Sequence, residues 1–327
     1  MRHPLINEVP ALRHIWGTVF GSSDFELFLG HYFALERCVV SEHGCTLASA
    51  GYYLPAGNIV FGGQIVPCAM IYAVATLPEY RNKGHGTAVV RSLIRRARDA
   101  GYPAVVLCPS SDELFGYYSA HTGLHDWFFV CEHRFNEAPK DAWEYPLEEI
   151  TAVEYARLRK TLLAGFPHVD SALSSFEYQG LLCKEFGGGF FRIDIPGGIS
   201  CAVVEQHADG TVWARELLMP AGGEADVFSS IVAAFPADEY VVRTPVINRN
   251  ESNHMLCFCK RESIIGTGER DFQQCAPWTD DYEYPSYMDD WGVDTVVKRF
   301  GMLAAPDSLL RAGSAKNAAP WYGLAFD

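Results

Sequence analysis

One segment restricts the possible folds of this chain more than any other: a strand that passes through a short glycine-containing loop directly into a helix. Apolar and β-branched residues predict the strand over 65–76. Apolar residues at helical spacing, with arginines between them, predict the helix over 84–100. A strand, a tight loop and an amphipathic helix in this order are typical of an α/β domain with a mixed sheet.

The loop has the features of an anion site. Gly84 and Gly86 flank His85 at the expected start of the helix, where backbone N–H groups lack partners and the helix dipole is positive. Arg81 and Lys83 add positive charge. The loop therefore predicts a pyrophosphate site. The third glycine of a dinucleotide-binding fingerprint and the P-loop pattern are both absent, which argues against those two alternatives.

The elements around this segment complete an α/β domain over residues 1–137, and a proline-containing stretch at 136–146 is a candidate linker. Helices are expected over 10–20, 25–35 and 110–121, and strands over 38–41, 46–54, 104–108 and 127–131.

Val74, Pro78, Arg81, Gly84 and Gly86 form the pattern V-x-x-x-P-x-x-R-x-x-G-x-G. This pattern resembles the signature of the GNAT superfamily of N-acetyltransferases. The resemblance implies the GNAT fold, a bulge in the strand, and acetyl-CoA as the cofactor whose pyrophosphate the loop binds. The implied cofactor-binding residues are Val74, Ala75, Thr76, Arg81, Asn82, Lys83, Gly84, His85, Gly86 and Thr87.

A second part of the resemblance lies in the helix at 110–121. In the family, a tyrosine near the end of this helix precedes a Gly-Phe pair and protonates the departing thiolate of CoA. Tyr118 is our choice for this catalytic role, since a phenol can serve as general acid. The distance to Gly123 is one residue longer than in the family pattern, and Leu124 replaces phenylalanine. Tyr117 is therefore the alternative, and simple packing of both rings is the third possibility.

The second half, residues 147–327, resembles a degenerate GNAT domain. Its loop at 219–223 lacks the R-x-x-G-x-G set, so we do not expect it to bind CoA. The elements expected here are helices over 147–163 and 224–235, and strands over 190–195, 199–206, 212–219 and 240–244, with a hairpin turn at Asp209-Gly210. The chain beyond Gly266 carries no clear pattern.

The tandem arrangement resembles the enhanced intracellular survival acetyltransferases without their third domain. In those enzymes the terminal carboxylate is the base, which implies a catalytic role for Asp327 here. An acceptor amine must lose a proton before or during attack. Glu79 and His121 are the other candidates for the base, and spacing does not distinguish among the three.

Composition limits the partners. The formal charge is −14, from 26 Lys and Arg against 40 Asp and Glu, which opposes nucleic-acid binding and mildly favours a cationic acceptor. The 10 Cys and 11 His show no metal-ligand spacing, so no metal is expected. The chain has no long apolar run and no signal-peptide pattern, so we expect a cytoplasmic protein without membrane contact. A homodimer is a reasonable expectation.

Together these observations predict an N-acetyltransferase that transfers an acetyl group from acetyl-CoA to a small-molecule or peptide amine. A non-catalytic module that binds acyl-CoA for regulation is the alternative. A nucleotide-dependent enzyme on a Rossmann sheet is a third hypothesis.

Overall fold

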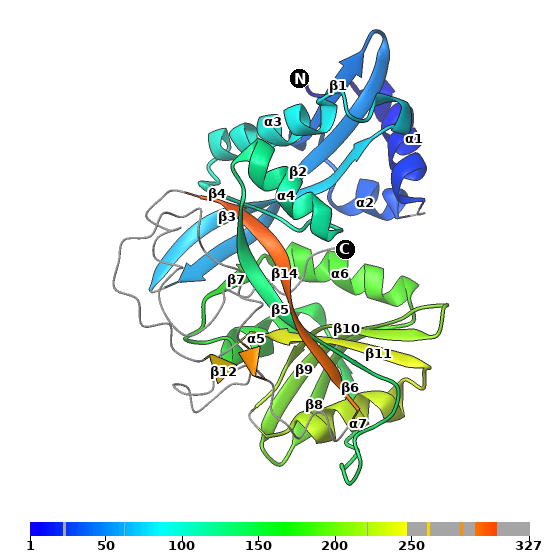
Figure 1. Cartoon of the computed structure of the whole chain (residues 1–327), viewed down its shortest axis with the longest axis vertical. Coiled ribbons are helices and arrows are strands. Elements are labelled where there is room, and N and C mark those ends of the chain that lie inside the picture. Colours follow the sequence, from blue (N-terminus) through cyan, green and yellow to red (C-terminus); the bar gives the residue numbers. More distant parts are fainter. Residues whose placement is uncertain are drawn as a thin grey trace.

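A computed structural model describes the chain over residues 1–21, 24–61, 63–220, 222–246, 260–261, 282–283 and 292–305. A mixed sheet of 12 strands runs through the molecule, with helices on both of its faces (Figure 1). Its hydrogen-bonded order is β1-β2-β3-β4-β14-β5-β11-β10-β9-β8-β6, and β7 pairs with β2 beside this path. The predicted fold class, a mixed central sheet with flanking helices, is confirmed.

The strands that form this sheet come from both halves of the chain. They are β1 (Cys38–His43), β2 (Thr46–Phe61), β3 (Gln64–Thr76), β4 (Ala104–Leu107), β5 (His125–Phe135), β6 (Leu147–Ile150), β7 (His168–Ser171), β8 (Gly189–Ile195), β9 (Gly198–Gln206), β10 (Thr211–Leu218), β11 (Glu239–Pro245) and β14 (Asp294–Ala304). Two short strands, β12 (Lys260–Arg261) and β13 (Tyr282–Glu283), pair only with each other.

The helices divide between the two faces because alternate strand residues point to opposite sides of the sheet. Side chains of α1 and α2 pack in one core with α5 and α6, while α3 and α4 pack in a second core on the other face, and α7 in a third. The helices are α1 (Val9–Phe20), α2 (Phe25–His31), α3 (His85–Asp99), α4 (Asp112–Thr122), α5 (Ala152–Leu162), α6 (Leu173–Glu185) and α7 (Glu224–Ala234). None of the described helices is long and apolar enough to cross a membrane.

The position of β14 was not anticipated. This strand lies in the part of the sequence without a clear pattern, yet it inserts between β4 and β5 and is antiparallel to both (Figure 1). Strand β5 in turn pairs with β11 over its second half. The sheet is therefore continuous across residues 137–147. The domain division at that point stays a prediction, and a strand from beyond it completes the sheet of the first part.

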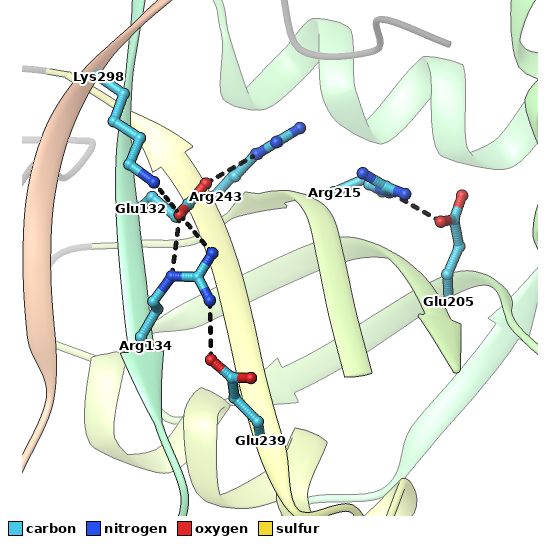
Figure 2. A network of polar contacts seen from close by, with 7 residues as sticks. All are labelled: Glu132, Arg134, Glu205, Arg215, Glu239, Arg243 and Lys298. Carbon is cyan, nitrogen blue, oxygen red and sulfur yellow. Dashed lines mark hydrogen bonds and ion pairs between the residues drawn. The ribbon is translucent and has the colours of Figure 1, made fainter. Parts of the chain in front are cut away.

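Polar side chains join the strands in this middle region. The carboxylate of Glu132 on β5 is only 3% exposed and forms ion pairs with Lys298 of β14, Arg243 of β11 and Arg134 of β5 at 2.5, 3.5 and 3.0 Å (Figure 2). The next residue, His133, is fully buried and lies 2.9 Å from the hydroxyls of both Thr295 and Thr244. These contacts attach β14 and β11 to the two edges of β5.

The structure differs from the expected elements in several places. The helix expected over 147–163 begins with strand β6, and α5 starts only after Thr151, whose hydroxyl accepts a hydrogen bond from the Glu154 backbone in a capping box. Strand β2 continues past residue 54 because a bulge near Pro55 allows the ladder to proceed. Strand β7 and helix α6 were not predicted. The hairpin turn at Gly210, between β9 and β10, is as predicted.

Candidate active site

The site begins where two parallel strands separate. β3 and β4 pair only between Cys68–Ile71 and Ala104–Leu107, and β3 then continues paired with β2 alone. A bulge bends β3 away from β4, since Ala73 and Val74 together oppose the single residue Gly51 of β2. Ala73 has a φ of 47°, a conformation that a residue with a side chain seldom adopts outside a functional or strained site. The bulge implied by the family resemblance is therefore present.

Gly51 is required by packing beside this bulge. A Cβ atom at this position would lie 3.0 Å from side-chain carbons of both Leu93 and Val89 on α3. The missing side chain lets α3 approach the bent part of the sheet. The approach places the first turn of α3 beside the end of β3.

The loop between β3 and α3 turns tightly twice. Pro78–Tyr80 forms one turn of 3-10 helix, and Asn82 and Gly84 then adopt left-handed conformations with φ of 61° and 79°. Gly84 occupies the N-cap position of α3 and supplies no side-chain cap. The first turn of α3 contains no acidic residue. The N–H groups at this helix start thus remain available to an anion.

Three side chains surround the loop. Arg81 donates to the carbonyl of Thr76, and Lys83 donates to the carbonyl of Glu79 at 2.9 Å. His85 lies 2.7 Å from the hydroxyl of Ser41. Burial, with smaller contributions from the neighbouring His43 and Lys83, lowers the pKa of His85. The imidazole is therefore neutral at pH 7, and the fixed positive charges of the loop are those of Arg81 and Lys83.

Two pairs of hydroxyls lie beside the loop, one at the end of β3 and one between α3 and α4. Thr76 donates to Ser49, and Ser49 donates to the carbonyl of Ala75. On the other side, the hydroxyl of Tyr117 lies 2.5 Å from that of Thr87. A Cβ atom at Gly86 would stand 3.4 Å from the Thr76 hydroxyl and 3.6 Å from the Tyr117 hydroxyl. Gly86 therefore lies between the strand end and α4. Neither Ser49 nor Ser41 belonged to the predicted set, because both come from strands distant in sequence.

The adjacent tyrosines of α4 have different surroundings. Tyr117 is partly exposed and faces the glycine loop, whereas Tyr118 is 8% exposed and packs in the core between α3, α4 and the sheet. Burial raises the pKa of Tyr118 to about 12. Among the described residues, no side chain or carbonyl pairs with the Tyr118 hydroxyl. Tyr118 thus retains its proton, and the sequence choice between the two tyrosines stays a prediction.

Two of the three candidates for the base lie in the described part of the chain. The ring of His121 lies 5.1 Å from that of Tyr117, and its carbonyl accepts from Arg91. Glu79 is exposed in the 3-10 turn of the loop. Asp327 lies outside the described residues.

The second half repeats the local geometry without the anion site. β10 and β11 are parallel over residues 211–214 and 239–242, and β10 carries a bulge between Ala214 and Glu216. Arg159 of α5 pairs with Glu216 at 2.7 Å, and the two side chains are 1% and 0% exposed. Two acidic residues, Glu224 and Asp226, occupy the first turn of α7. Negative charge at that helix start opposes an anion.

Comparisons with known proteins agree with this geometry. Residues 1–120 match the family model described as an acetyltransferase (GNAT) domain. No curated protein matched the sequence.

Solved structures extend the likeness beyond the matched segment. A probable N-acyltransferase from Enterococcus faecalis V583 has a TM-score of 0.61 at 13% identity, over 93% of this chain and 72% of that one. A GCN5-related N-acetyltransferase from Anabaena variabilis scores 0.58 at 18% identity, over 92% and 71%. Eis1 from Mycobacterium abscessus scores 0.54 at 14% identity, over 93% and 73%. This chain thus has the GNAT fold, and its residues 1–120 match the model of a GNAT acetyltransferase domain.

Proposed function

We propose that this protein transfers an acetyl group from acetyl-CoA to the nitrogen of an amine. One observation carries the proposal: the separation of β3 from β4 leads directly to a helix start that has no side-chain cap and no acidic residue. An open strand edge suits the amide-rich arm of acetyl-CoA, and the adjacent helix start suits its pyrophosphate.

The residues at this place fit such a molecule. Val74, Ala75 and Thr76 lie beyond the last pair between β3 and β4, so they are free of hydrogen bonds to β4. Residues 84–87 supply the uncapped backbone N–H groups at the start of α3, and Arg81 and Lys83 supply positive charge. Gly86 keeps the space beside the Thr76 hydroxyl clear of a side chain. These are the residues that would hold the molecule.

Acetyl-CoA supplies a thioester, whose carbonyl carbon accepts the amine and whose sulfur leaves as a thiolate. The chain contributes orientation and a proton. The bulged end of β3 orients the thioester with its backbone amides. Tyr118 donates the proton to the leaving sulfur, because its buried hydroxyl keeps its proton at neutral pH. Tyr117 helps to hold the cofactor at the glycine loop, where its hydroxyl lies beside that of Thr87.

The acceptor amine is proposed to be cationic in solution, in keeping with the net charge of −14. Such an amine must lose a proton before it attacks. Glu79, His121 and the terminal Asp327 are the groups proposed for that step. The second set of diverging strands, β10 and β11, is proposed not to bind the cofactor, because a buried ion pair and two acidic residues occupy the corresponding positions.

The test of turnover is consumption of acetyl-CoA across a panel of amines, together with calorimetric titration of CoA. Tyr118→Phe should lower kcat by about 10²–10⁴-fold while the affinity for CoA stays within about twofold. Tyr117→Phe should instead weaken CoA binding. Tyr102→Phe, on the same face of the sheet, is the matched control and should change neither.

The outcomes separate the hypotheses. If Tyr118→Phe leaves turnover unchanged and Tyr117→Phe lowers kcat alone, the two roles are reversed. If CoA binds but no amine is acetylated, the regulatory module is the better description. If CoA does not bind at all, the proposal fails.

A charge placed in the loop tests the cofactor site without relying on turnover. His85→Glu puts a carboxylate in the first turn of α3, where it should stabilise the helix by about 0.3–1 kcal/mol. The same carboxylate should repel a pyrophosphate and weaken CoA binding by more than tenfold. His85→Gln is the neutral control, which also changes the contact with Ser41. Equal CoA affinity in the two variants would refute the assigned position of the pyrophosphate.

A further inference from the structure

A group of arginines on the outer face of α3 has no part in the proposed function. Arg91, Arg95 and Arg98 follow each other at spacings of four and three residues, so they share one stripe of the helix. They line an open hollow of about 300 Å³ together with Ile94, Asp99 and Thr122. The hollow lies between the second half of α3 and the end of α4.

These arginines differ from most others in the described part of the chain, because they have no carboxylate partner. The side chain of Arg91 donates to the carbonyl of His121 at 2.6 Å. The side chains of Arg95 and Arg98 form no hydrogen bond or ion pair with the part of the chain that the structure describes. Elsewhere most arginines have a carboxylate partner, including those drawn in Figure 2. The paired arginines are Arg2, Arg13, Arg134, Arg159, Arg192, Arg215, Arg243 and Arg299.

The arrangement places three like charges on one stripe of the helix, with a single acidic residue, Asp99, among the residues that line the hollow. Like charges three or four residues apart destabilise a helix, and acidic residues outnumber basic ones by 14 in the chain. Arg98 lies in the last turn of α3, where a cation is favourable next to the free carbonyls, and Arg91 serves the end of α4 in the same way. Neutralisation of helix ends does not account for Arg95 or for a hollow that all three arginines line.

We propose that this hollow binds a small anion that carries at least two phosphate or carboxylate groups. The planar guanidinium group pairs with both kinds of oxyanion through two parallel hydrogen bonds. Arg91 and Arg98 are seven residues apart, which is about 10 Å along the helix, so separate anionic groups of one ligand can each meet an arginine. Ile94 is the sole apolar residue among those that line the hollow, which disfavours an apolar ligand.

The proposed anion site is distinct from the glycine loop. Arg95 is ten residues beyond His85, or about 15 Å along α3. The inference therefore does not depend on the proposed transfer of an acetyl group.

Calorimetric titration at low ionic strength tests the site, with pyrophosphate and citrate as separate probes. The titrations use the His85→Glu protein, in which the added carboxylate blocks the glycine loop by charge, because CoA itself carries phosphate groups and would compete for the hollow. One or both probes should bind to the blocked protein. The probe that binds more tightly identifies phosphate or carboxylate as the preferred group.

The decisive comparison is between two pairs of substitutions with the same change in charge. Arg95→Gln with Arg98→Gln should weaken binding of the probe by at least about tenfold. Arg13→Gln with Arg192→Gln removes two exposed arginines elsewhere and should leave the affinity within about twofold. If the protein with both Arg95→Gln and Arg98→Gln does not fold, the single substitution Arg95→Gln is tested in its place.

Three results would overturn the inference. In the first, neither probe binds to the blocked protein. In the second, both pairs of substitutions weaken binding equally, so that only the overall field matters. In the third, the change at Arg95 and Arg98 lowers the melting temperature without changing the affinity, which is the outcome expected if these side chains only neutralise the end of α3.

Discussion

The stability of this protein should depend on pH through one buried histidine. His133 on β5 is completely buried, and its two ring nitrogens lie 2.9 Å from the hydroxyls of Thr295 on β14 and Thr244 on β11. Burial lowers the pKa of His133 from 6.5 to about 3. The folded protein therefore holds this imidazole neutral over the range in which the unfolded chain protonates it.

The sign and the size follow from proton linkage. Between pH 6.5 and 3 the unfolded state binds one proton more than the folded state at this residue, so the free energy of unfolding falls as the pH falls. The slope is about 1.4 kcal/mol per pH unit within that window. Between pH 7 and pH 5, protonation of the unfolded His133 should remove about 2 kcal/mol of stability.

Urea unfolding followed by tryptophan fluorescence, at pH 7, 6 and 5, measures this slope. His133→Gln should lose about 2 kcal/mol less than the wild type over this interval, whatever its stability at pH 7. Thr295→Val is the control, because it removes a hydrogen-bond partner and leaves the buried imidazole in place. This control should be less stable at every pH and should keep the wild-type slope. Equal slopes for the wild type and His133→Gln would refute the reasoning.

Three further predictions concern packing and charge. Gly51→Ala places a Cβ atom 3.0 Å from Leu93 and should cost about 1–3 kcal/mol in thermal or urea unfolding; Gly51→Ala in a Leu93→Ala background should cost less than this. Arg159→Met or Glu216→Leu alone leaves a buried charge and should cost about 3–5 kcal/mol, while the double substitution should recover most of the loss; additive losses would contradict this. Glu132→Gln should increase hydrogen exchange in β14 and β11 more than in β9, and uniform exchange would argue against the proposed attachment.

Sequence patterns predicted an element correctly where residues close together in the sequence determine it. The helix expected over 84–100 is α3, because its apolar stripe and its glycine start are both contained in the segment. The same holds for the hairpin turn at Gly210. The strand β6 was missed although Thr151 and Glu154, a capping pair, mark the true start of α5. That signal was present in the sequence.

Only part of the candidate site could be predicted from such local patterns. The positions of Gly84 and Gly86 follow from the loop pattern, and the structure places both at the start of α3. The contact between Thr87 and Tyr117 joins two helices, and the contact of His85 with Ser41 spans 44 residues. Neither could be derived from spacing, because spacing does not specify how α3 and α4 are rotated against each other.

The strand-loop-helix segment by itself determined the kind of domain and predicted an anion site, since a glycine loop at a helix start exposes backbone N–H groups whatever lies around it. Only the tertiary structure decided which strand completes the sheet. β14 pairs with β4 and β5 across more than 150 residues, and this pairing depends on complementary edges and on contacts such as Glu132 with Lys298. Such pairing is a property of two distant segments together, so neither segment reveals it alone.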